Sequence, residues 1–472
     1  MKSVGGARKP WRERGAQAPM ELKNLIVDRL DSDASQGREA FAYISQHYEN
    51  QPRIGVCCRD VCLRVSRGDE GTKCLLDRVS FDAPPGTMTA IMGASGSGKS
   101  TLLDCLLDLH RPTDGSIVGY GYDAGAGFCA YVKQHQAFFS RLTVRETLQH
   151  SMAIQLHSTP SEQRHTWLRH LLHLLSLTEC QDTRVQVISG GEQRRLAIGL
   201  ELIQLPSVLV LDEPTSGLDS TNAELLLERL QQFARAGCTI IMAIHQSSSA
   251  MYARFDHIVL MRNKASVCFA GTRDQATRMA LAMSAHSPSV PHSIPELLVS
   301  MAGNVNLQPT HSAQCTQAHN DAAALRTRQP TAWWRPCLAL LRRNLLNQAR
   351  DPHVFMTRVL IYGLLAMLVI LLFNDLRNEP DDLERRVRAL YFFSSTVVAL
   401  TIACMPAMMQ ERAVYLQETQ NGHYSPLSYV LMTSVANLPY LLVRLKRRWA
   451  LCLRRWRLRA PPTLLTCRTC RF

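Results

Sequence analysis

The chain has 472 residues and a formal net charge of +14, with 46% hydrophobic and 19% charged residues. This length allows more than one domain, each able to bury its own core, and the composition suits a chain that is partly soluble and partly in a membrane. Its 15 cysteines are scattered without regular spacing, which favours reduced cytosolic thiols and argues against a disulfide framework.

Residues 1–52 are rich in Arg, Lys, Gly and Ser and show no hydrophobic period. They lack the apolar core of a signal peptide, and acidic residues soon follow the basic start, which argues against a transit peptide. We expect a mostly disordered cytosolic leader at 1–52, with a short helix near Met20–Arg29.

A phosphate-binding loop follows the apolar run Met88–Met92, which predicts a buried strand, and precedes Ser100–Leu109, whose apolar spacing predicts a helix. The glycines of such a loop let backbone N–H groups approach phosphates, while its lysine and hydroxyl meet the terminal phosphates and magnesium. The loop therefore predicts binding of a nucleotide and Mg²⁺. Its residues are Gly93, Ala94, Ser95, Gly96, Ser97, Gly98, Lys99, Ser100 and Thr101.

Two further motifs narrow the class of nucleotide-binding protein. The stretch Ser189–Gln193 ends 19 residues before Asp212, a spacing and order that P-loop kinases and small GTPases do not have. The apolar run Val208–Leu211 predicts a strand that ends in two carboxylates, Asp212 and Glu213, at the carboxyl edge of a parallel sheet. There Asp212 can order the magnesium shell and Glu213 can polarise water.

Taken singly, neither Gln134 nor His245 distinguishes a catalytic role from a structural one. A histidine after an apolar run such as Thr239–Ile244 is more often structural than catalytic. His245 lies 32 residues beyond Glu213, at the end of another strand-like run, and Gln134 follows Ala130–Lys133. Because all five motifs occur in a fixed order, we assign both residues to one ATP-hydrolysing cassette.

The chain resembles the ATP-binding cassette transporters, and more narrowly the White (ABCG) half-transporters, in which the cassette precedes the membrane domain. The resemblance covers about residues 55–440. It implies an α/β P-loop NTPase cassette with a parallel-sheet core and antiparallel β and helical subdomains, followed by an α-helical transmembrane domain. The specific marks are Leu142–Thr147, Gly190–Arg195, Asp212–Ser220, His245-Gln246, Arg343-Asn344 and Arg350–Pro352.

The resemblance also implies the roles of the site residues. Each ATP would lie between the phosphate loop of one subunit and the signature of another, which is formed by Ser189, Gly190, Gly191 and Glu192. Asp219 would communicate across that interface. The implied catalytic residues are Glu213, as general base, His245 and Gln134, and the implied magnesium ligands are Ser100, Gln134 and Asp212.

Beyond the cassette at 53–283, residues 284–331 are rich in Pro, Ser, His, Ala and Gln and predict a linker, interrupted by a short helix at Ile294–Ala302. Residues 332–352 contain the amphipathic basic stretch Cys337–Asn347, which is suited to lying at a membrane face.

The segment 353–443 predicts a partial transmembrane domain. Val359–Phe373 is an apolar run of 15 residues that reaches spanning length if it extends to Val354, and Ala389–Met409 is an uncharged stretch of 21 residues. We expect these to be two spans joined by an external loop at 374–388. Tyr429–Val443 is a marginal third candidate of 15 residues.

The tail at 444–472 carries ten basic and no acidic residues. Subtracting these ten charges from +14 leaves +4 for the other 443 residues, so the basicity is local and does not argue for nucleic-acid binding. If Tyr429–Val443 crossed the membrane, this tail would lie outside, against the positive-inside tendency. We therefore expect an incomplete membrane domain and a tail that is not the family's native ending.

The apolar stretches predict a multi-pass membrane protein with a cytosolic cassette, and the resemblance implies that such a protein exports lipid-like or other hydrophobic small molecules by ATP hydrolysis. Its expected cofactors are ATP and Mg²⁺, and its expected partners are membrane lipid, the substrate and a second half-transporter, the same or different, with no nucleic acid. In this short form it is not expected to transport alone. Two alternatives stay open, a non-transporting regulatory or inactive membrane-attached fragment and a soluble cassette ATPase acting on nucleic acid or ribosomes.

Overall fold

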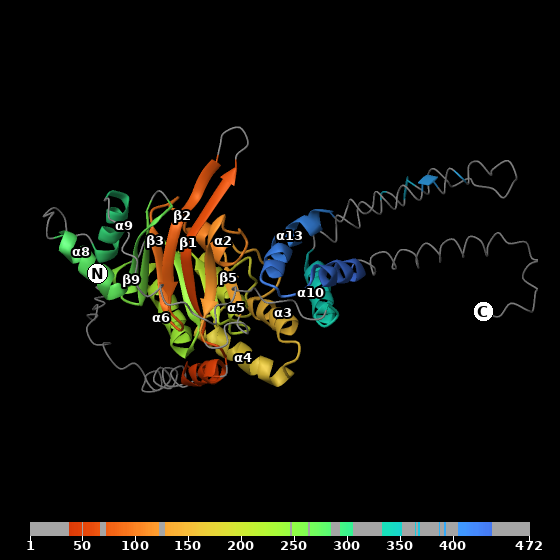
Figure 1. Ribbon diagram of the computed structural model, residues 1–472. Helices are drawn as coiled ribbons and strands as arrows, with labels where there is room; N and C mark the ends of the chain where they lie inside the picture. Colours follow the sequence, from red (N-terminus) through yellow and green to blue (C-terminus); the bar gives the residue numbers. More distant parts are fainter. Residues whose placement is uncertain are drawn as a thin grey trace, which may run out of the picture.

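The computed structural model describes nine segments and six single residues. They are residues 37–49, 51–66, 72–121, 128–245, 248–262, 265–284, 293–304, 333–351 and 405–436, with 364, 367, 368, 387, 391 and 392. The main body contains a six-stranded mixed sheet, a three-stranded antiparallel sheet and helices packed around both (Figure 1). The predicted cassette fold, with a parallel-sheet core and antiparallel and helical parts, is confirmed in these residues.

The six-stranded sheet forms the centre of the fold. All neighbouring strands pair in parallel except the last two. Four adjacent strands, the first four in the spatial order given in the next sentence, are buried along their whole length, which explains their nearly continuous apolar sequences. In spatial order the strands are β5 (Cys129–Val132), β6 (Val208–Asp212), β7 (Thr239–Ile244), β3 (Met88–Gly93), β8 (His257–Met261) and β9 (Val267–Thr272).

The register of the parallel strands brings their carboxyl ends to one edge. Met92 in β3 lies beside Ile244, the last residue of β7. Asp212, the last residue of β6, lies beside Ala243 in β7. The loops that follow β3, β5, β6 and β7 therefore begin at the same edge, which is where ligands bind in sheets of this kind.

Alternate residues of the central strands face two different hydrophobic cores. One core includes Ile91 and lies on the side of the antiparallel sheet, formed in the order β2 (Thr72–Ala83), β1 (Gly55–Ser66) and β4 (Asp114–Tyr120). Leu102 and Leu103 of α2 (Lys99–Leu106) are fully buried in the same core. This packing holds α2 directly beyond the end of β3.

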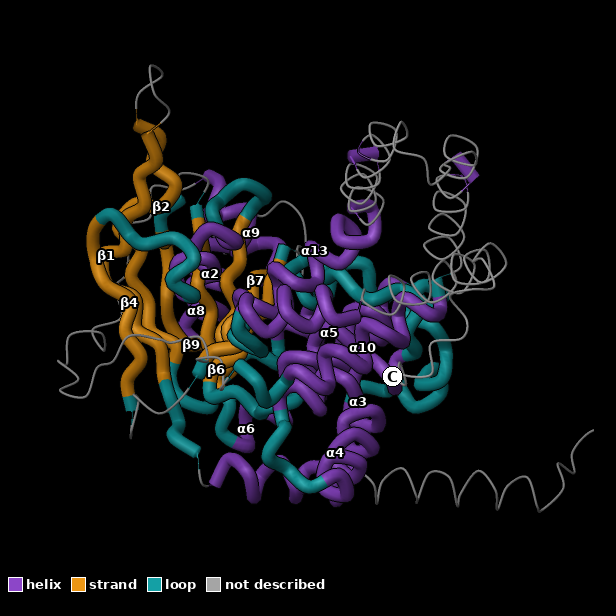
Figure 2. The backbone as a smooth tube through the Cα atoms, turned by 90° about the vertical axis from the view of Figure 1, so that its right-hand side faces the viewer, coloured by secondary structure: helices purple, strands orange, loops and turns teal. Residues whose placement is uncertain are grey.

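The opposite face of the central sheet is covered by helices. Figure 2 shows α3, α4, α5 and α6 beside the strands, and Ala90 and Met92 of β3 are buried in the core between them. The helices of this layer are α3 (Val144–Gln155), α4 (Ser161–Leu174), α5 (Gly190–Leu202), α6 (Ser220–Ala236), α7 (Ser249–Tyr252), α8 (Arg273–Ser284) and α9 (Ile294–Asn304).

Two segments that the sequence assigned to the leader and the linker belong to this helical core. Residues 37–49 form a helix in which Ile44 is fully buried and Tyr48 Oη donates a 2.8 Å hydrogen bond to Pro206 O. Leu298 of α9 is also fully buried. Both helices thus pack on the cassette core outside the expected limits of 53 and 283, because a few apolar residues in polar segments are enough to dock a short helix. The expected helix at Met20–Arg29 lies outside the described residues.

The C-terminal helices lie at the end of the cassette away from α8 and α9 (Figure 1). They are α10 (Cys337–Arg350), α13 (Met405–Gln420) and a helix over residues 426–436. Among the described residues, no helix combines the length and hydropathy needed to cross a membrane. The expected spans at 359–373 and 389–409 lie mostly outside the described residues, as do residues 437–443 of the third candidate and all of 444–472.

The docked helix at 37–49 gives a stability prediction. Ile44→Ala removes a fully buried side chain and should destabilise the cassette by about 2–5 kcal/mol. Phe41→Ala on the same helix, where the side chain is 37% exposed, should have a much smaller effect. Thermal unfolding of the purified chain measures both, and equal shifts in the two variants would show that this helix does not dock as described.

Candidate functional site

The phosphate loop connects β3 to α2 through a tight backbone path. Gly96 and Gly98 have φ values of 79° and 93°, a left-handed conformation that strains other residues. A Cβ on Gly93 would lie 2.6 Å from Met261 O, so this residue must also be small. Gly98 N-caps α2 without a side-chain hydrogen bond, which leaves the first N–H groups of the helix directed at the loop. Such a helix start favours a bound anion.

Lys99 folds back over the loop that it follows. Its Nζ donates hydrogen bonds to Gly93 O at 2.9 Å and to Ala94 O at 3.0 Å. Burial lowers the pKa of Lys99, although the carboxylates of Glu213 and Asp212 oppose that shift. The structure thus places a largely buried ammonium group beside the loop, where phosphates would add the acceptors that a cation favours.

Asp212 provides a test of whether the site suits magnesium. Burial raises the pKa of Asp212, while a hydrogen bond from Ser100 lowers it. Among the described residues, Asp212 Oδ1 has no hydrogen-bond partner although it is buried. A free carboxylate oxygen beside a hydroxyl matches the oxygen ligands that Mg²⁺ prefers. Ser100 and Asp212 therefore fit the predicted ion, with Gln134 near the same edge.

Glu213 lies beside Gln134 in an unusual backbone conformation. Gln134 Nε2 donates a 2.8 Å hydrogen bond to Glu213 Oε2. Glu213 has a φ of 48°, in the left-handed region, which costs a residue with a side chain about 1–3 kcal/mol. Its N–H donates to Ala243 O at 3.1 Å, which holds this conformation against β7. The structure thus brings together two of the three side chains predicted to be catalytic, Gln134 and Glu213.

His245 and Asp219 are both exposed. His245 directly follows β7, so it begins at the edge where the phosphate loop and Glu213 begin. Asp219 N-caps α6 by accepting a 3.2 Å hydrogen bond from Asn222 N, and the hydrogen bonds from Asn222 lower the pKa of Asp219. Its observed role is to cap a helix, and a contact across a subunit interface stays a prediction.

The signature begins α5 with a capping box. Ser189 N donates a 2.8 Å hydrogen bond to Glu192 Oε2, and Ser189 Oγ accepts one of 3.3 Å from Glu192 N. Partial burial opposes ionisation, but the hydrogen bonds from Ser189 outweigh it and lower the pKa of Glu192. Ser189 and Gly190 are exposed, and within the described residues the hydrogen bonds of Ser189 stay inside this cap. The signature is therefore presented outward, and Glu192 shapes it.

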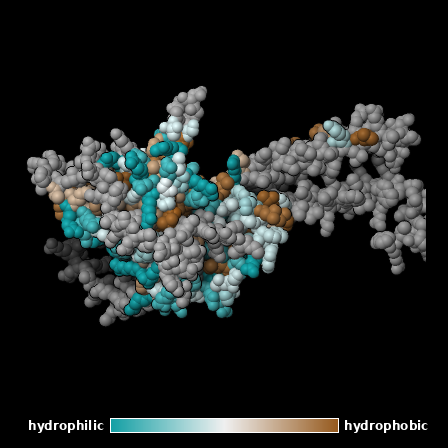
Figure 3. Space-filling model, in the orientation of Figure 1, coloured by the Kyte–Doolittle hydropathy of each residue, from teal (hydrophilic) through white to brown (hydrophobic). Residues whose placement is uncertain are grey.

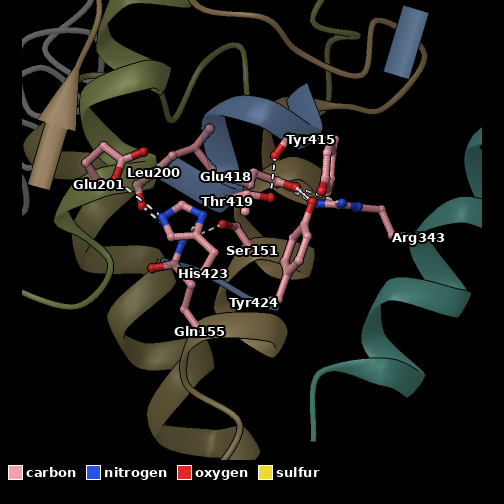
Figure 4. Close-up of polar contacts among 10 residues, drawn as sticks. All are labelled: Ser151, Gln155, Leu200, Glu201, Arg343, Tyr415, Glu418, Thr419, His423 and Tyr424. Atoms are coloured by element: carbon pink, nitrogen blue, oxygen red, sulfur yellow. Dashed lines mark hydrogen bonds and ion pairs between the residues drawn. The ribbon is translucent and has the colours of Figure 1, made fainter. Parts of the chain in front are cut away.

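A buried polar network joins the cassette to the C-terminal helices (Figure 4). Arg343 of α10 donates hydrogen bonds of 2.5 and 2.9 Å to the two carboxylate oxygens of Glu418 in α13. Tyr424 Oη donates a 2.6 Å hydrogen bond to the same carboxylate. Burial opposes ionisation of Glu418, but Arg343 outweighs it and lowers the pKa of Glu418. This ion pair fixes α10 and α13 relative to each other.

His423 extends this network into the cassette. Figure 4 shows its ring between Glu201 of α5 and Gln155 of α3. His423 Nε2 lies 3.4 Å from Glu201 Oε2, and Nδ1 lies 3.5 Å from Gln155 Nε2. Glu201 belongs to the helix that begins with the signature, so the network reaches α5 at its carboxyl end.

Other contacts bring the C-terminal helices to α3 and to the Gln134 segment. Lys133 Nζ donates a 2.5 Å hydrogen bond to Gln420 Oε1, and Asn421 Nδ2 donates one of 3.0 Å to Tyr131 O. Arg350, at the end of α10, makes two hydrogen bonds of 2.5 and 2.8 Å to the carboxylate of Glu146 in α3. The segment before Gln134 is thus in direct contact with α13.

The helix over residues 426–436 exposes apolar side chains on the side away from this network. Figure 3 shows apolar surface at this end of the molecule, next to a largely hydrophilic cassette. The exposed residues are Leu427, Val430, Leu431 and Val435, at 54, 57, 37 and 37%.

Comparisons with known proteins agree with this arrangement. A family model described as ABC transporter matches residues 76–216, and one described as ABC-2 type transporter matches residues 335–445. The chain is similar to ABC transporter G family members 17, 7 and 20 of Arabidopsis thaliana, at 29, 31 and 29% identity. These alignments cover 85, 80 and 82% of this chain but only 66, 58 and 59% of the relatives.

The two matched domains follow each other in the order expected from the resemblance, although the chain spans less than two thirds of the length of these relatives. The cassette match supports ATPase activity, and the second match implies a membrane protein. Two parts of the chain therefore match domains of ATP-binding cassette transporters, and the relatives to which it is similar are members of their G family.

Proposed function

We propose that this chain binds Mg²⁺ and ATP at the carboxyl edge of its sheet and hydrolyses ATP as a head-to-tail dimer. Hydrolysis drives export of a lipid-like or other hydrophobic small molecule. One observation carries the proposal. Four adjacent parallel strands end at the same edge of the sheet, and the chain that follows them supplies the phosphate loop, the Gln134 segment, Glu213 and His245. The membrane-domain match at 335–445 favours this function over a soluble ATPase acting on nucleic acid or ribosomes.

The residues divide the chemistry of phosphoryl transfer among them. The N-terminus of α2 and Lys99 bind the phosphates, and Ser100, Asp212 and Gln134 would hold Mg²⁺, which neutralises charge on the phosphate oxygens. Water attacks the terminal phosphorus, the bond to the ADP oxygen breaks, and Glu213 accepts the proton of the water. His245 contacts the terminal phosphate. Positioning and charge stabilisation supply most of the rate acceleration in this reaction.

A second chain completes each site. The exposed signature at Ser189 and Gly190 caps its own helix and makes no hydrogen bond to the phosphate loop within the described residues. In a symmetric dimer the two chains exchange these surfaces, so each ATP lies between the loop of one chain and the signature of its partner. The partner is a second copy or another G-family half-transporter.

The contacts with α10 and α13 provide a route from the ATP site to the membrane domain. Gln134 is adjacent to Lys133, which is hydrogen-bonded to Gln420, and α5 is linked through Glu201 to His423. A shift of Gln134 or of α5 when ATP binds therefore moves the end of α13. The buried Arg343–Glu418 pair transmits that shift to α10 as a rigid unit.

The roles of Glu213 and Lys99 predict different defects. Glu213→Gln should preserve ATP binding and reduce turnover by roughly 10²- to 10⁴-fold, because the general base is lost. Lys99→Ala should weaken ATP binding itself by about 10- to 100-fold, through loss of a charged hydrogen-bond donor. Nucleotide binding and phosphate release on the purified chain separate the two effects. The exposed residues Glu179 and Lys73 supply the controls Glu179→Gln and Lys73→Ala, and undiminished hydrolysis in both site variants would refute the assignment.

The composite site predicts complementation. A Ser189→Arg chain and a Lys99→Ala chain are each inactive alone, but a mixed dimer keeps one site with an intact loop and signature. Co-expression should restore roughly a quarter of the wild-type activity per chain, for random pairing in a two-fold dimer. Phosphate release from co-purified, differently tagged chains measures it. No recovery in verified mixed dimers would favour an ATPase that works within a single chain.

His423 gives the contact between the cassette and the C-terminal helices a pH dependence. Burial lowers the pKa of His423, but the carboxylates of Glu201 and Glu418 outweigh it and raise the pKa above 6.5. The protonated ring therefore makes its full contribution to the free energy of unfolding below about pH 6.5. That contribution is lost as pH rises through the raised pKa of His423. The difference in unfolding midpoint between the wild-type chain and His423→Gln should shrink over that range, and a constant difference from pH 6 to pH 9 would contradict it.

A further inference from the structure

Arg194 is a buried side chain of α5, five residues beyond Ser189 and 6% exposed. Its guanidinium group donates four hydrogen bonds, all to main-chain carbonyl oxygens. Nη1 donates to Lys133 O at 2.5 Å and to Gln134 O at 2.6 Å. Nη2 donates to Glu213 O at 2.6 Å and to Asp212 O.

The four acceptors lie at the carboxyl ends of two neighbouring strands, Asp212 at the last position of β6 and the other three just beyond β5 and β6. β5 and β6 pair in parallel as far as Val132 and Leu211. The guanidinium group bridges the two chain segments immediately beyond that last pair, where the ladder no longer joins them. Because its donors form a rigid planar fork, it fixes the distance and orientation of the two segments more closely than a flexible side chain could.

The bridge also holds the strained backbone of Glu213. The N–H of Glu213 is bonded to Ala243 O at 3.1 Å, and its carbonyl is bonded to Arg194, so both peptide groups that flank its left-handed φ of 48° are held. Gln134 and Glu213, whose side chains meet at 2.8 Å, are each held through their main chain by the same guanidinium group.

We infer that Arg194 is a positioning residue for ATP hydrolysis, which sets the Gln134 and Glu213 backbones at the separation that catalysis needs and ties both to the helix that begins with the signature. The inference rests on the roles proposed above for Gln134 and Glu213. Arg194 touches neither ATP nor water and acts through the main chain of these two residues.

Kinetics on the full-length chain in lipid nanodiscs test this role. Arg194→Met removes the bridge, and Arg194→Lys keeps the charge and the long stem but has only three donors on one atom and cannot reproduce the planar fork of four hydrogen bonds. Both variants should bind ATP within about twofold of the wild type and show KM near the wild-type value, while kcat falls roughly 10- to 100-fold, as for other small misplacements of catalytic groups. Arg235→Met, at an exposed arginine of α6, is the matched control and should keep the wild-type kcat.

The outcomes separate this inference from the proposed function. If Glu213→Gln is inactive but Arg194→Lys and Arg194→Met both retain kcat within twofold, the positioning role is wrong and the proposed function stands. A wild-type kcat in Arg194→Lys but not in Arg194→Met also overturns the positioning role, because a positive charge without the bridge would then be enough for normal turnover. If Arg194→Met fails to fold, Arg194→Lys decides the question through the same split between kcat and KM. A wild-type chain without ATPase activity, alone or with a partner, would overturn both proposals.

Discussion

The parallel register of the central sheet is the constraint on which the rest of the site depends. In β6, Leu209 and Leu211 face the helical core while Val208 and Val210 face the core beside the antiparallel sheet. A slip by one residue would exchange these faces, so burial on both sides determines the register strongly. The same register places Asp212 at the last position of its strand. Packing of apolar residues far from the nucleotide therefore determines where the carboxylates and the phosphate loop begin.

A second constraint acts where the cassette meets the C-terminal helices. The Arg343 and Glu418 side chains are 3% and 14% exposed, so each charge depends on the other and on Tyr424 for its hydrogen bonds. Removing one partner from such a pair leaves an unpaired buried charge, which costs about 3–5 kcal/mol, whereas the complete network is stable. The contact thus has one favourable geometry, which fixes α10 and α13 against the cassette surface they touch.

Much of the cassette could be predicted because its motifs are local. The strand, loop and helix around Lys99 appear in the sequence as an apolar run, glycines and a second apolar period, and the capping box of Ser189 and Glu192 lies within four residues. The docked helix at 37–49 was missed because its buried residues Ala40, Ile44 and Tyr48, although spaced four apart, are too few in a polar segment to give a strong helical pattern. Its burial becomes visible only when the partner surface around Pro206 is folded.

The buried polar residues were missed for a related reason. Arg194 lies in the signature stretch, yet its partners at Lys133 and Glu213 are separated from it in sequence, and main-chain carbonyls leave no trace in residue identity. Arg343 was noticed only as part of a family mark, while Glu418 and His423 stand in a segment with no regular apolar period. Residues of this kind are recognised when topology brings them together.

Photocleavage with trapped vanadate tests the central claim most directly, because vanadate replaces the terminal phosphate and ultraviolet light breaks the backbone beside it. We expect two cleavage positions in wild-type chains supplied with Mg²⁺ and ATP, one in the phosphate loop at 93–101 and one at Ser189. The second cut requires the signature to touch the phosphate that the loop binds. Cleavage confined to the phosphate loop would contradict a site shared between two chains, and no vanadate-dependent cleavage at either position would contradict the site itself.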